Sequence, residues 1–470
     1  MLASASAAAK APEPDSVVAA LCESVDRFCA RHVRAQEIDA AGRIPLVVIE
    51  GLAALGVFGA TLPAEHGGGD LGLVGAAELI ETLARHDRSV ATTVGLHLGL
   101  GTRALVEHGS AEQHARYLPS LASGETIAAF ATTEPAAGSD LSAIGTTLTE
   151  EGDLLRLRGQ KAFVTNGGLA CLFTVAARTK TSAGAAATTL VLVERGDKGV
   201  VQLGEERKLG LRGSSTTGFV FEDVALPRER VLGALGSGQA QLDRVLAWGR
   251  LLMSAGCVGT AQAALDRALR YTAERRQFGK RLDEQPVVRM LTDGMRARVA
   301  AMRAMVRAAA ATDGETLARL SASAKVFCSE SAWRVGDTAL QLHGGSGYIE
   351  DTGLALLLRD ARVTRIFEGA NEVLLTQLGL LELSQRTTFA ERTAGAVHEL
   401  ARRVEAHRQR LHEEQGVRVV RDKLALYRLG QAVILRDAAL AAERTADPDL
   451  ARAFANDALR DAVLHLGEWP

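Results

Sequence analysis

The sequence has 470 residues, of which 47% are hydrophobic and 23% are charged, an ordinary composition for a globular protein. A chain of this length exceeds the usual size of one hydrophobic core and predicts two or more packed regions. The formal net charge of -2 argues against a general nucleic-acid binder, although local basic residues can still bind a polyphosphate.

The first segment, 1–16, is rich in alanine and has one lysine, so it lacks the basic start and apolar core of a secretory signal. We expect it to be a mobile tail. No uncharged apolar run reaches the roughly 18 residues that suggest a membrane-spanning helix. The sequence therefore predicts a cytoplasmic protein without a transmembrane segment.

The hydrophobic period changes twice along the chain and predicts the domain boundaries. Apolar residues recur every three or four positions over 17–128, which predicts helices. Short apolar runs and period-two alternation over 129–234 predict strands, with a flexible loop at 181–187. The helical period returns over 235–385 and continues in a further stretch, 386–470. The predicted fold is mainly α with a small central β domain.

Five cysteines are far apart in the sequence, at Cys22, Cys29, Cys171, Cys257 and Cys328. Their number is odd and no CxxC spacing occurs, so they predict buried thiols in a reducing compartment and no disulfide framework. The histidines do not cluster at metal-ligand spacing either. We expect no metal site.

Glu368 is a lone acid between apolar neighbours and a flexible Gly-Ala step. Burial disfavours the charged form of a carboxylate, so an acid held there becomes a stronger base that can take a proton from carbon. The alternative is an acid at a helix start that interacts with the helix dipole. From this segment alone the helix-start interpretation is favoured.

Two segments of the β region carry polar groups suited to a flat cofactor. Residues 130–140 combine small hydroxyls with a proline turn and a glycine that permits close backbone approach. In 159–168, alternation puts Phe163 and Thr165 on one face of a strand, where they can pack on and hydrogen-bond a flavin. Each segment alone is also compatible with a plain hairpin.

A basic segment, 274–281, ends a predicted long helix. Cations at a helix C-terminus are stabilised by about 0.3 to 1 kcal/mol each, so the cluster has a structural explanation as a solvated helix end. With Phe278 beside Arg275, it can also hold a diphosphate and an adenine. Since no Walker loop or GxGxxG fingerprint occurs, a nucleotide cofactor is not held by either device.

In their order along the chain, these segments resemble the acyl-CoA dehydrogenase family, from about residue 18 to 380. The resemblance is greatest to the very-long-chain branch, with a shortened C-terminal helical extension. It implies an N-terminal helical domain, a β-barrel-like middle domain, a four-helix bundle and that extension. The motifs that carry it are residues 133–140, 161–168, 208–213, 221–227, 275–280, 341–348 and 367–369.

The resemblance implies an FAD enzyme that dehydrogenates an acyl-CoA thioester to a trans-2-enoyl-CoA. Glu368 matches the base that removes the α-proton, while the β-hydrogen leaves as hydride to flavin N5. In some members the base comes from the bundle's first long helix, at the position of Gly249 here, which cannot be a base. Small residues over 91–97 favour a medium-to-long acyl chain. An electron-transfer flavoprotein as acceptor and a homodimer or homotetramer are also implied.

The resemblance also implies the binding residues. Ala370 departs from the usual threonine and removes a hydroxyl donor to FAD, which costs about 0.5 to 1.5 kcal/mol of cofactor binding. A neighbouring subunit reaches the adenine half of FAD through Arg275, Phe278, Gln341 and Gly345. The implied cofactor positions are Phe130, Thr132, Thr133, Ser139, Phe163, Thr165, Arg275, Phe278, Gln341, Gly345, Ala370 and Glu372, and the implied substrate positions are Ser139, Arg250 and Gly369.

Alternatives stay open at two residues and for the activity. Ser139 can simply cap a turn, and Arg250 can simply pair with an acid. The protein can instead act on a carrier-protein-tethered acyl thioester or be an acyl-CoA oxidase. A third possibility is a non-catalytic flavin-binding assembly protein, with which the missing hydroxyl at Ala370 agrees.

Overall fold

The computed structural model describes residues 16–180, 186–384, 395–444 and 447–467. Nearly all of the predicted tail, 1–16, and most of the predicted loop, 181–187, lie outside these residues. Within the described ranges, no helix combines the length and the apolar character needed to cross a membrane.

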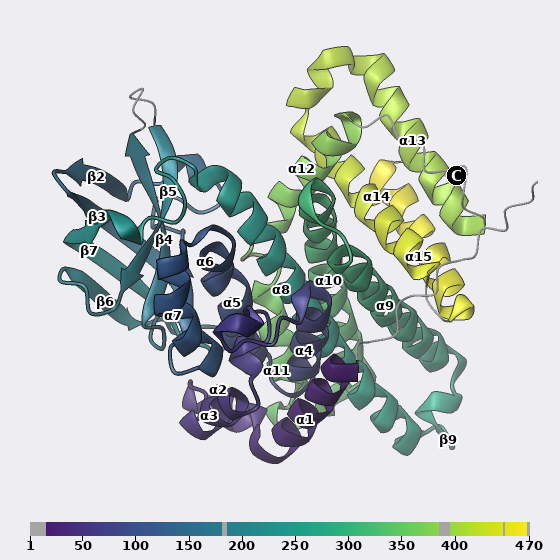
Figure 1. Cartoon of the computed structure of the whole chain (residues 1–470). Coiled ribbons are helices and arrows are strands. Elements are labelled where there is room, and N and C mark those ends of the chain that lie inside the picture. Colours follow the sequence, from purple (N-terminus) through teal and green to yellow (C-terminus); the bar gives the residue numbers. More distant parts are fainter. Residues whose placement is uncertain (1–15, 181–185, 385–394, 445–446, 468–470) are drawn as a thin grey trace, which may run out of the picture.

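Short helices make up the N-terminal region (Figure 1). A π-helical turn, His97–Gly101, joins two of them. The last helix starts with a capping box, in which Ser110 Oγ accepts from the Gln113 amide and Gln113 Oε1 accepts from the Ser110 amide. The helices are α1 (Ser16–His32), α2 (Ala35–Ala41), α3 (Leu46–Ala54), α4 (Gly72–His86), α5 (Arg88–Leu96), α6 (Thr102–His108) and α7 (Ala111–Ser123).

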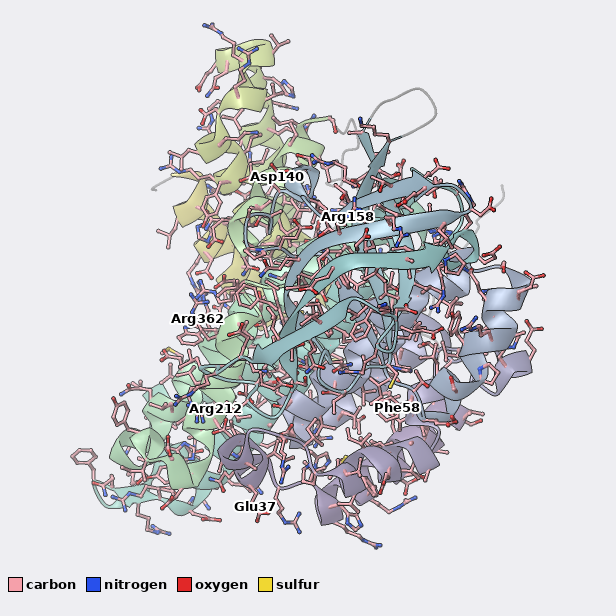
Figure 2. The ribbon with its side chains drawn as sticks, turned by 90° about the vertical axis from the view of Figure 1, so that its left-hand side faces the viewer. Glu37, Phe58, Asp140, Arg158, Arg212 and Arg362 are labelled. Carbon is pink, nitrogen blue, oxygen red and sulfur yellow. The ribbon has the colours of Figure 1, made fainter. Side chains whose placement is uncertain are left out.

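A curled seven-stranded sheet follows, with the strand order β1-β4-β2-β3-β7-β6 and with β5 paired to β4. Alternation is clear in β3, where Leu155 and Leu157 are buried while Arg158 is exposed. Figure 2 shows Arg158 on the outer face of the sheet. The strands are β1 (Ala128–Ala131), β2 (Thr147–Glu151), β3 (Leu154–Thr165), β4 (Leu172–Lys180), β5 (Ala186–Glu194), β6 (Val200–Glu205) and β7 (Thr216–Pro227).

Long helices form the centre of the molecule, where α8 packs against both α4 and α10. The basic segment after α8 forms a short hairpin of β8 (Arg276–Gln277) and β9 (Lys280–Arg281), so it follows the helix and is not part of its last turn. The helices are α8 (Gly238–Glu274), α9 (Pro286–Ala310), α10 (Gly314–His343), α11 (Leu354–Val363) and α12 (Asn371–Ser384).

The C-terminal extension consists of α13 (Gly395–Gln415), α14 (Lys423–Ala442) and α15 (Pro448–Leu466), and it lies on the side of the bundle away from the sheet (Figure 1). Helices α12 and α14 cross closely at Gly379 and Gly430. A Cβ at either glycine would lie 2.0 Å from a carbonyl oxygen of the other helix. A buried ion pair between Arg436 and Glu382 also joins these helices. The extension is therefore fixed to the helix that follows Glu368.

The cysteines are unpaired, as the sequence predicts. Cys29, Cys257 and Cys328 are buried and Cys22 is half-buried, but Cys171, directly before β4, is exposed, so the prediction of burial is wrong for that residue. Across the described residues, no group of three or more His, Cys, Asp and Glu side chains is arranged to hold a metal ion.

Candidate active site

The loop between α11 and α12 carries Glu368 in an uncommon backbone conformation. Glu368 has a φ of 58° and Gly369 a φ of 100°, both in the left-handed region that non-glycine residues rarely adopt. Lys325 of α10 donates from Nζ to the Gly369 carbonyl at 2.6 Å and to Asn371 Oδ1 at 2.7 Å. Because strained backbone persists only where its surroundings over-determine it, these contacts explain how the loop is held.

Glu368 does not start a helix. Helix α12 begins at Asn371, and the acid in its first turn is Glu372. The helix-start interpretation is therefore wrong for Glu368.

The Glu368 carboxyl is desolvated. Its Oε2 atom is buried and has no hydrogen-bond partner among the described residues, although part of the residue is open to the cavity. Burial raises the pKa of Glu368 to about 7, while the positive charges of Arg250 and Lys325 act in the opposite direction. Burial also lowers the pKa of Lys325 to about 8. A carboxyl with a pKa near 7 is matched to proton transfer at neutral pH.

Arg250 of α8 touches the same loop, because its Nε donates to the Glu368 carbonyl oxygen at 3.1 Å. Among the described residues no carboxylate forms an ion pair with Arg250, so the alternative that it simply pairs with an acid is not supported. Its neighbour Gly249 leaves the space that the carboxyl occupies. A Cβ at Gly249 would lie 2.9 Å from Glu368 Oε2 and 2.5 Å from Leu100 Cδ2.

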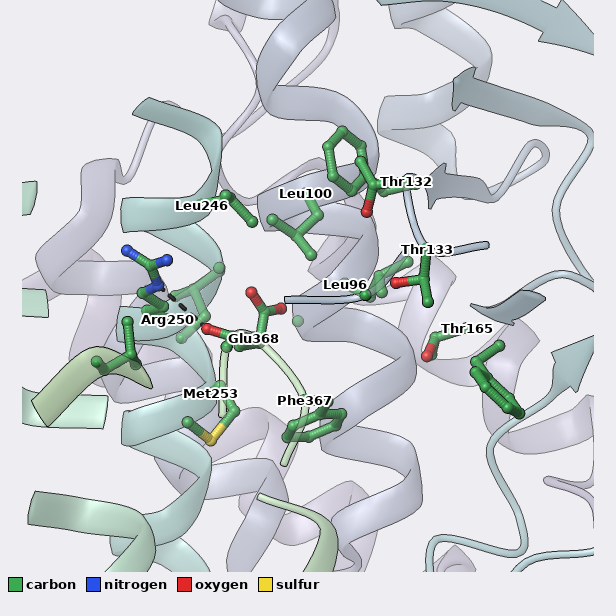
Figure 3. Close-up of a pocket in the computed structure, with 18 of the residues that line it drawn as sticks. Leu96, Leu100, Thr132, Thr133, Thr165, Leu246, Arg250, Met253, Phe367 and Glu368 are labelled. Atoms are coloured by element: carbon green, nitrogen blue, oxygen red, sulfur yellow. Dashed lines mark hydrogen bonds between the residues drawn. The ribbon is translucent and has the colours of Figure 1, made fainter. Parts of the chain in front are cut away.

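Glu368 opens onto a cavity of about 520 Å³ between α5, α8 and the sheet (Figure 3). One wall is formed by α5 and the π-helical turn, and a second wall by α8. Nine residues proposed from the sequence meet here, from four separate segments: Phe130, Thr132, Thr133, Ser139, Phe163, Thr165, Arg250, Glu368 and Gly369.

The sheet side of the cavity fits a flat aromatic ring. Figure 3 shows Thr132, Thr133 and Thr165 on the side opposite Glu368. Phe163 and Thr165 both line the cavity, as expected, but strand alternation is interrupted there. Phe163 has a φ of 55°, lies in a β-bulge and is 63% exposed, so its ring faces open space. These residues provide an apolar face beside hydroxyl groups, which fits a flavin.

A buried ion pair supports this side of the cavity. Lys161, fully buried, donates from Nζ to Glu134 Oε1 at 2.7 Å and to the Thr132 carbonyl at 3.0 Å. The Glu134 carboxylate in turn accepts from the amides of Gly145 and Thr146. The backbone beside Thr133 is therefore fixed before any ligand binds.

Ser139 lines the cavity and is not the residue that caps the following turn. Its neighbour Asp140 does so, since Asp140 Oδ1 accepts from the Ser142 amide at 3.0 Å. The capping alternative is therefore wrong for Ser139.

The other proposed cofactor residues lie outside the cavity of this single chain: Arg275, Phe278, Gln341, Gly345, Ala370 and Glu372. Phe278 is 94% exposed between β8 and β9, and Gln341 and Gly345 are exposed at the end of α10. Arg275 directly follows α8 and Glu372 is in the first turn of α12. One chain does not bring these residues to the cavity.

The segment 91–97, expected at the far end of the acyl tunnel, divides between two roles. Ala91, Gly95 and Leu96 line the cavity. His97 does not, because its ring is buried and hydrogen-bonds to the Phe58 carbonyl and the Ala128 amide, each at 3.1 Å. Burial lowers the pKa of His97 to about 4, so it is a neutral structural residue.

Sequence reasoning missed two buried cations and one half-buried threonine around the cavity. Lys325 holds the Glu368 loop, Arg88 lines the cavity and Thr92 lies one turn from Arg88. Each of these residues lies in a segment whose pattern is that of an ordinary amphipathic helix. The sequence offers one weak sign of the Arg88 site, which is Gly256 in the middle of a long helix. A glycine there can be interpreted only when the residue that faces it is known.

Three family models match the chain in order. The model of the N-terminal domain of acyl-CoA dehydrogenase matches residues 18–125, that of the middle domain 129–224 and that of the C-terminal domain 236–380.

Known proteins resemble the chain in sequence and in structure. The very long-chain specific acyl-CoA dehydrogenase of Macaca fascicularis mitochondria is 36% identical over 367 residues, which are 75% of this chain and 56% of that protein. The cyclohex-1-ene-1-carbonyl-CoA dehydrogenase of Geobacter metallireducens is 38% identical over 344 residues, 72% of this chain and 90% of that protein. The chain thus spans about half the length of the very-long-chain relatives it matches.

A solved acyl-CoA dehydrogenase from Bacillus anthracis, complexed with FAD, superposes with a TM-score of 0.86 at 25% identity. The superposition covers 97% of this chain and 88% of that chain, so the likeness includes the C-terminal extension.

Proposed function

Because the chain belongs to the acyl-CoA dehydrogenase family, whose members use FAD, we propose that it is an oxidoreductase that converts an acyl-CoA thioester into a trans-2-enoyl-CoA. The main support is the Glu368 carboxyl, which is desolvated and whose pKa is raised to about 7. It opens onto the cavity opposite Thr132, Thr133 and Thr165 (Figure 3). These properties suit a base that takes a proton from carbon.

In the proposed reaction, Glu368 takes the α-proton of the acyl thioester. Bound FAD would supply the two-electron acceptor that this step needs, for a β-hydrogen that leaves as hydride. The two electrons of the α C–H bond then form the new double bond. Lys325 and Arg250 hold the loop through the Gly369 and Glu368 carbonyls, which keeps the carboxyl aimed into the cavity.

The flavin is proposed to lie along Phe130, Thr132, Thr133, Phe163 and Thr165. The exposed face of Phe163 and the braced Thr132 carbonyl support this position. The proposed substrate contacts are Ser139, Arg250 and Gly369, each of which lines the cavity. Small residues along α5 support a medium-to-long acyl chain.

Four of the remaining cofactor positions are proposed to contact the FAD of a second subunit, namely Arg275, Phe278, Gln341 and Gly345. Ala370 and Glu372 stay proposed cofactor positions. Phe278 at 94% exposure, on a hairpin that projects from α8, supports contact with another copy of the chain. A homodimer or homotetramer is proposed, with an electron-transfer flavoprotein as electron acceptor. The proposed domain division is 17–128, 129–234, 235–385 and 386–470.

The test is anaerobic mixing of the FAD-loaded protein with acyl-CoAs while the flavin absorbance is followed. Glu368→Gln is expected to retain FAD and to slow flavin reduction by at least about 100-fold, since the base is removed. The matched variant is Asp243→Asn, which removes the other carboxylate of the cavity, an exposed one. Near-normal reduction with Glu368→Gln, or a larger loss with Asp243→Asn, refutes the assignment of the base.

The same assay separates the alternatives. Bleaching by an acyl carrier protein thioester but by no acyl-CoA would favour the carrier-tethered reaction. Fast reoxidation by oxygen would identify an oxidase. FAD that neither thioester bleaches would favour a non-catalytic flavin-binding protein.

A further inference from the structure

Arg88, the first residue of α5, is a buried cation without a counter-ion. It is 3% exposed, and within the described ranges no carboxylate oxygen lies within the 4.0 Å of an ion pair. Its Nη2 donates to the Met253 carbonyl at 3.0 Å and lies 3.9 Å from Cys257 Sγ, while its Nε is buried without any partner. Buried charges are normally paired, so this arrangement calls for an explanation.

Neither of the two acidic groups that act electrostatically on Arg88 is a good counter-ion. Burial raises the pKa of the Cys257 thiol, which keeps it neutral. Asp360 acts on Arg88 electrostatically, but its Oδ1 accepts from the Leu211 amide at 2.6 Å. Burial raises the pKa of Asp360 to about 7, so the carboxyl is partly protonated at neutral pH. Asp360 therefore does not neutralise Arg88 fully.

Space for the guanidinium is provided by α8. A Cβ at Gly256 would lie 1.2 Å from Arg88 Nη1, so any other residue at that position would displace the group. The glycine stands in the interior of a long helix, where glycine costs about 1 kcal/mol relative to alanine. Helices α5 and α8 are thus complementary around this cation.

Arg88 lines the same cavity as Glu368. Along α5, the cavity-lining residues Arg88, Ala91, Thr92 and Gly95 follow helical spacing and share one face. The small residues among them leave the space in front of this face open. Thr92 Oγ1 is buried and also lacks a partner among the described residues, so two of the residues that line this wall each carry an unsatisfied polar atom.

Helix α8 gives the separation between the base and this cation. Glu368 Oε2 lies against Gly249, and Arg88 Nη1 lies against Gly256. These glycines are seven residues apart on one helix, which is about two turns, so they share a face and stand about 10 Å apart along the axis. A chain of methylene groups can span this distance past Met253.

We propose that the deep end of the cavity binds a carboxylate at the far end of the acyl group, so that the protein's substrates are medium-length acyl-CoA thioesters with a terminal carboxylate. This inference rests on the proposed function. The Arg88 guanidinium forms a charge-assisted pair with the carboxylate, in which Nε gains the partner that it lacks. The Thr92 hydroxyl donates a further hydrogen bond.

The test compares paired acyl-CoAs of equal length that end in a methyl group or in a carboxylate. The FAD-loaded protein is expected to show at least a tenfold higher kcat/KM for the carboxylate member at one medium length. Arg88→Met is expected to lower kcat/KM for that substrate by at least about 30-fold, since a buried charge pair is lost. Arg88→Lys, which keeps the charge, is expected to retain more of the kcat/KM for the carboxylate substrate than Arg88→Met does.

Two further variants separate recognition from general damage. Gly256→Ala keeps the charge but displaces the guanidinium, so it is expected to reduce the preference for the carboxylate. Arg85→Met removes an arginine at the end of α4 that is outside the cavity, and it is expected to leave the preference unchanged. A preference for the methyl member at every length refutes the inference. So does an equal loss for both members with Arg88→Met.

Binding to Glu368→Gln keeps this inference distinct from the proposed reaction. Titration of the FAD-loaded variant with each acyl-CoA, followed by perturbation of the flavin spectrum, measures affinity without turnover. Tighter binding of the carboxylate member supports the subsite even if no acyl-CoA reduces the wild-type flavin, an outcome that would refute the proposed function alone. Equal or weaker binding of the carboxylate member refutes the subsite.

Discussion

Gly249→Ala is expected to impair catalysis through two neighbours of the new methyl group. The added Cβ would lie 2.5 Å from Leu100 Cδ2, 2.8 Å from Leu100 Cγ and 2.9 Å from Glu368 Oε2. Non-bonded carbon atoms in contact are about 3.5 to 4.0 Å apart, so at least one neighbour must move by about 1 Å. Extra methyl groups in a packed site typically cost about 1–3 kcal/mol.

Either movement reduces activity. Glu368 Oε2 has no hydrogen-bond partner to hold it, so the carboxyl can turn away, and a displacement of about 1 Å can cost about 100-fold in rate. Leu100 can instead rotate into the cavity that it lines, where it would occupy the space of the acyl chain.

Stopped-flow flavin reduction under anaerobic conditions separates the two responses. Movement of Glu368 lowers the maximal rate, while movement of Leu100 raises the acyl-CoA concentration needed for half of that rate. We expect a total loss of about 10- to 100-fold with FAD content retained. The control is Gly294→Ala in α9, where an added Cβ meets nothing within 4 Å and should stabilise the protein by about 0.5–1 kcal/mol. A Gly249→Ala rate within threefold of wild type would refute the account.

Three other outcomes follow from the site. The kcat/KM of flavin reduction should fall about tenfold per pH unit below pH 7, because burial raises the pKa of Glu368 to about 7 and the base must be deprotonated; a profile that is flat between pH 5 and 7 contradicts this. Lys161→Met should lower the free energy of unfolding by about 3–5 kcal/mol in denaturant titration, since Glu134 is left as an unpaired buried charge. The double variant with Glu134→Gln should lose less free energy of unfolding than Lys161→Met alone. Equal losses in the two variants would contradict the ion pair. Ala370→Thr should tighten FAD binding by about 2- to 10-fold in a dissociation assay, since it adds a hydroxyl, and unchanged affinity would disprove that role.

Glu368, the proposed base, illustrates how much of the site the sequence predicts. Apolar neighbours and a glycine step suggested a desolvated acid at Glu368, and the structure confirms that Oε2 is buried without a partner. The left-handed φ of Glu368 and the Lys325 contacts that hold the loop were not predictable, because they depend on α10, which is remote in sequence.

The β region shows a similar limit. Alternation correctly predicted strand residues such as Leu155 and Leu157, since a strand buries one face. The bulge at Phe163 was not predicted, because a bulge is defined by pairing with β7. That pairing decides which way the Phe163 ring faces.

The sequence by itself determined the order of helical and β regions and the family resemblance, and it singled out Glu368 as the proposed base, because local periodicity and ordered motifs are properties of the chain alone. The tertiary structure decided which side chains of different helices and strands lie against each other. Gly256 is an unremarkable residue in α8 until Arg88 of α5 is laid against it. Whether a buried cation is paired depends on every element packed around it, and no local pattern in the sequence contains that information.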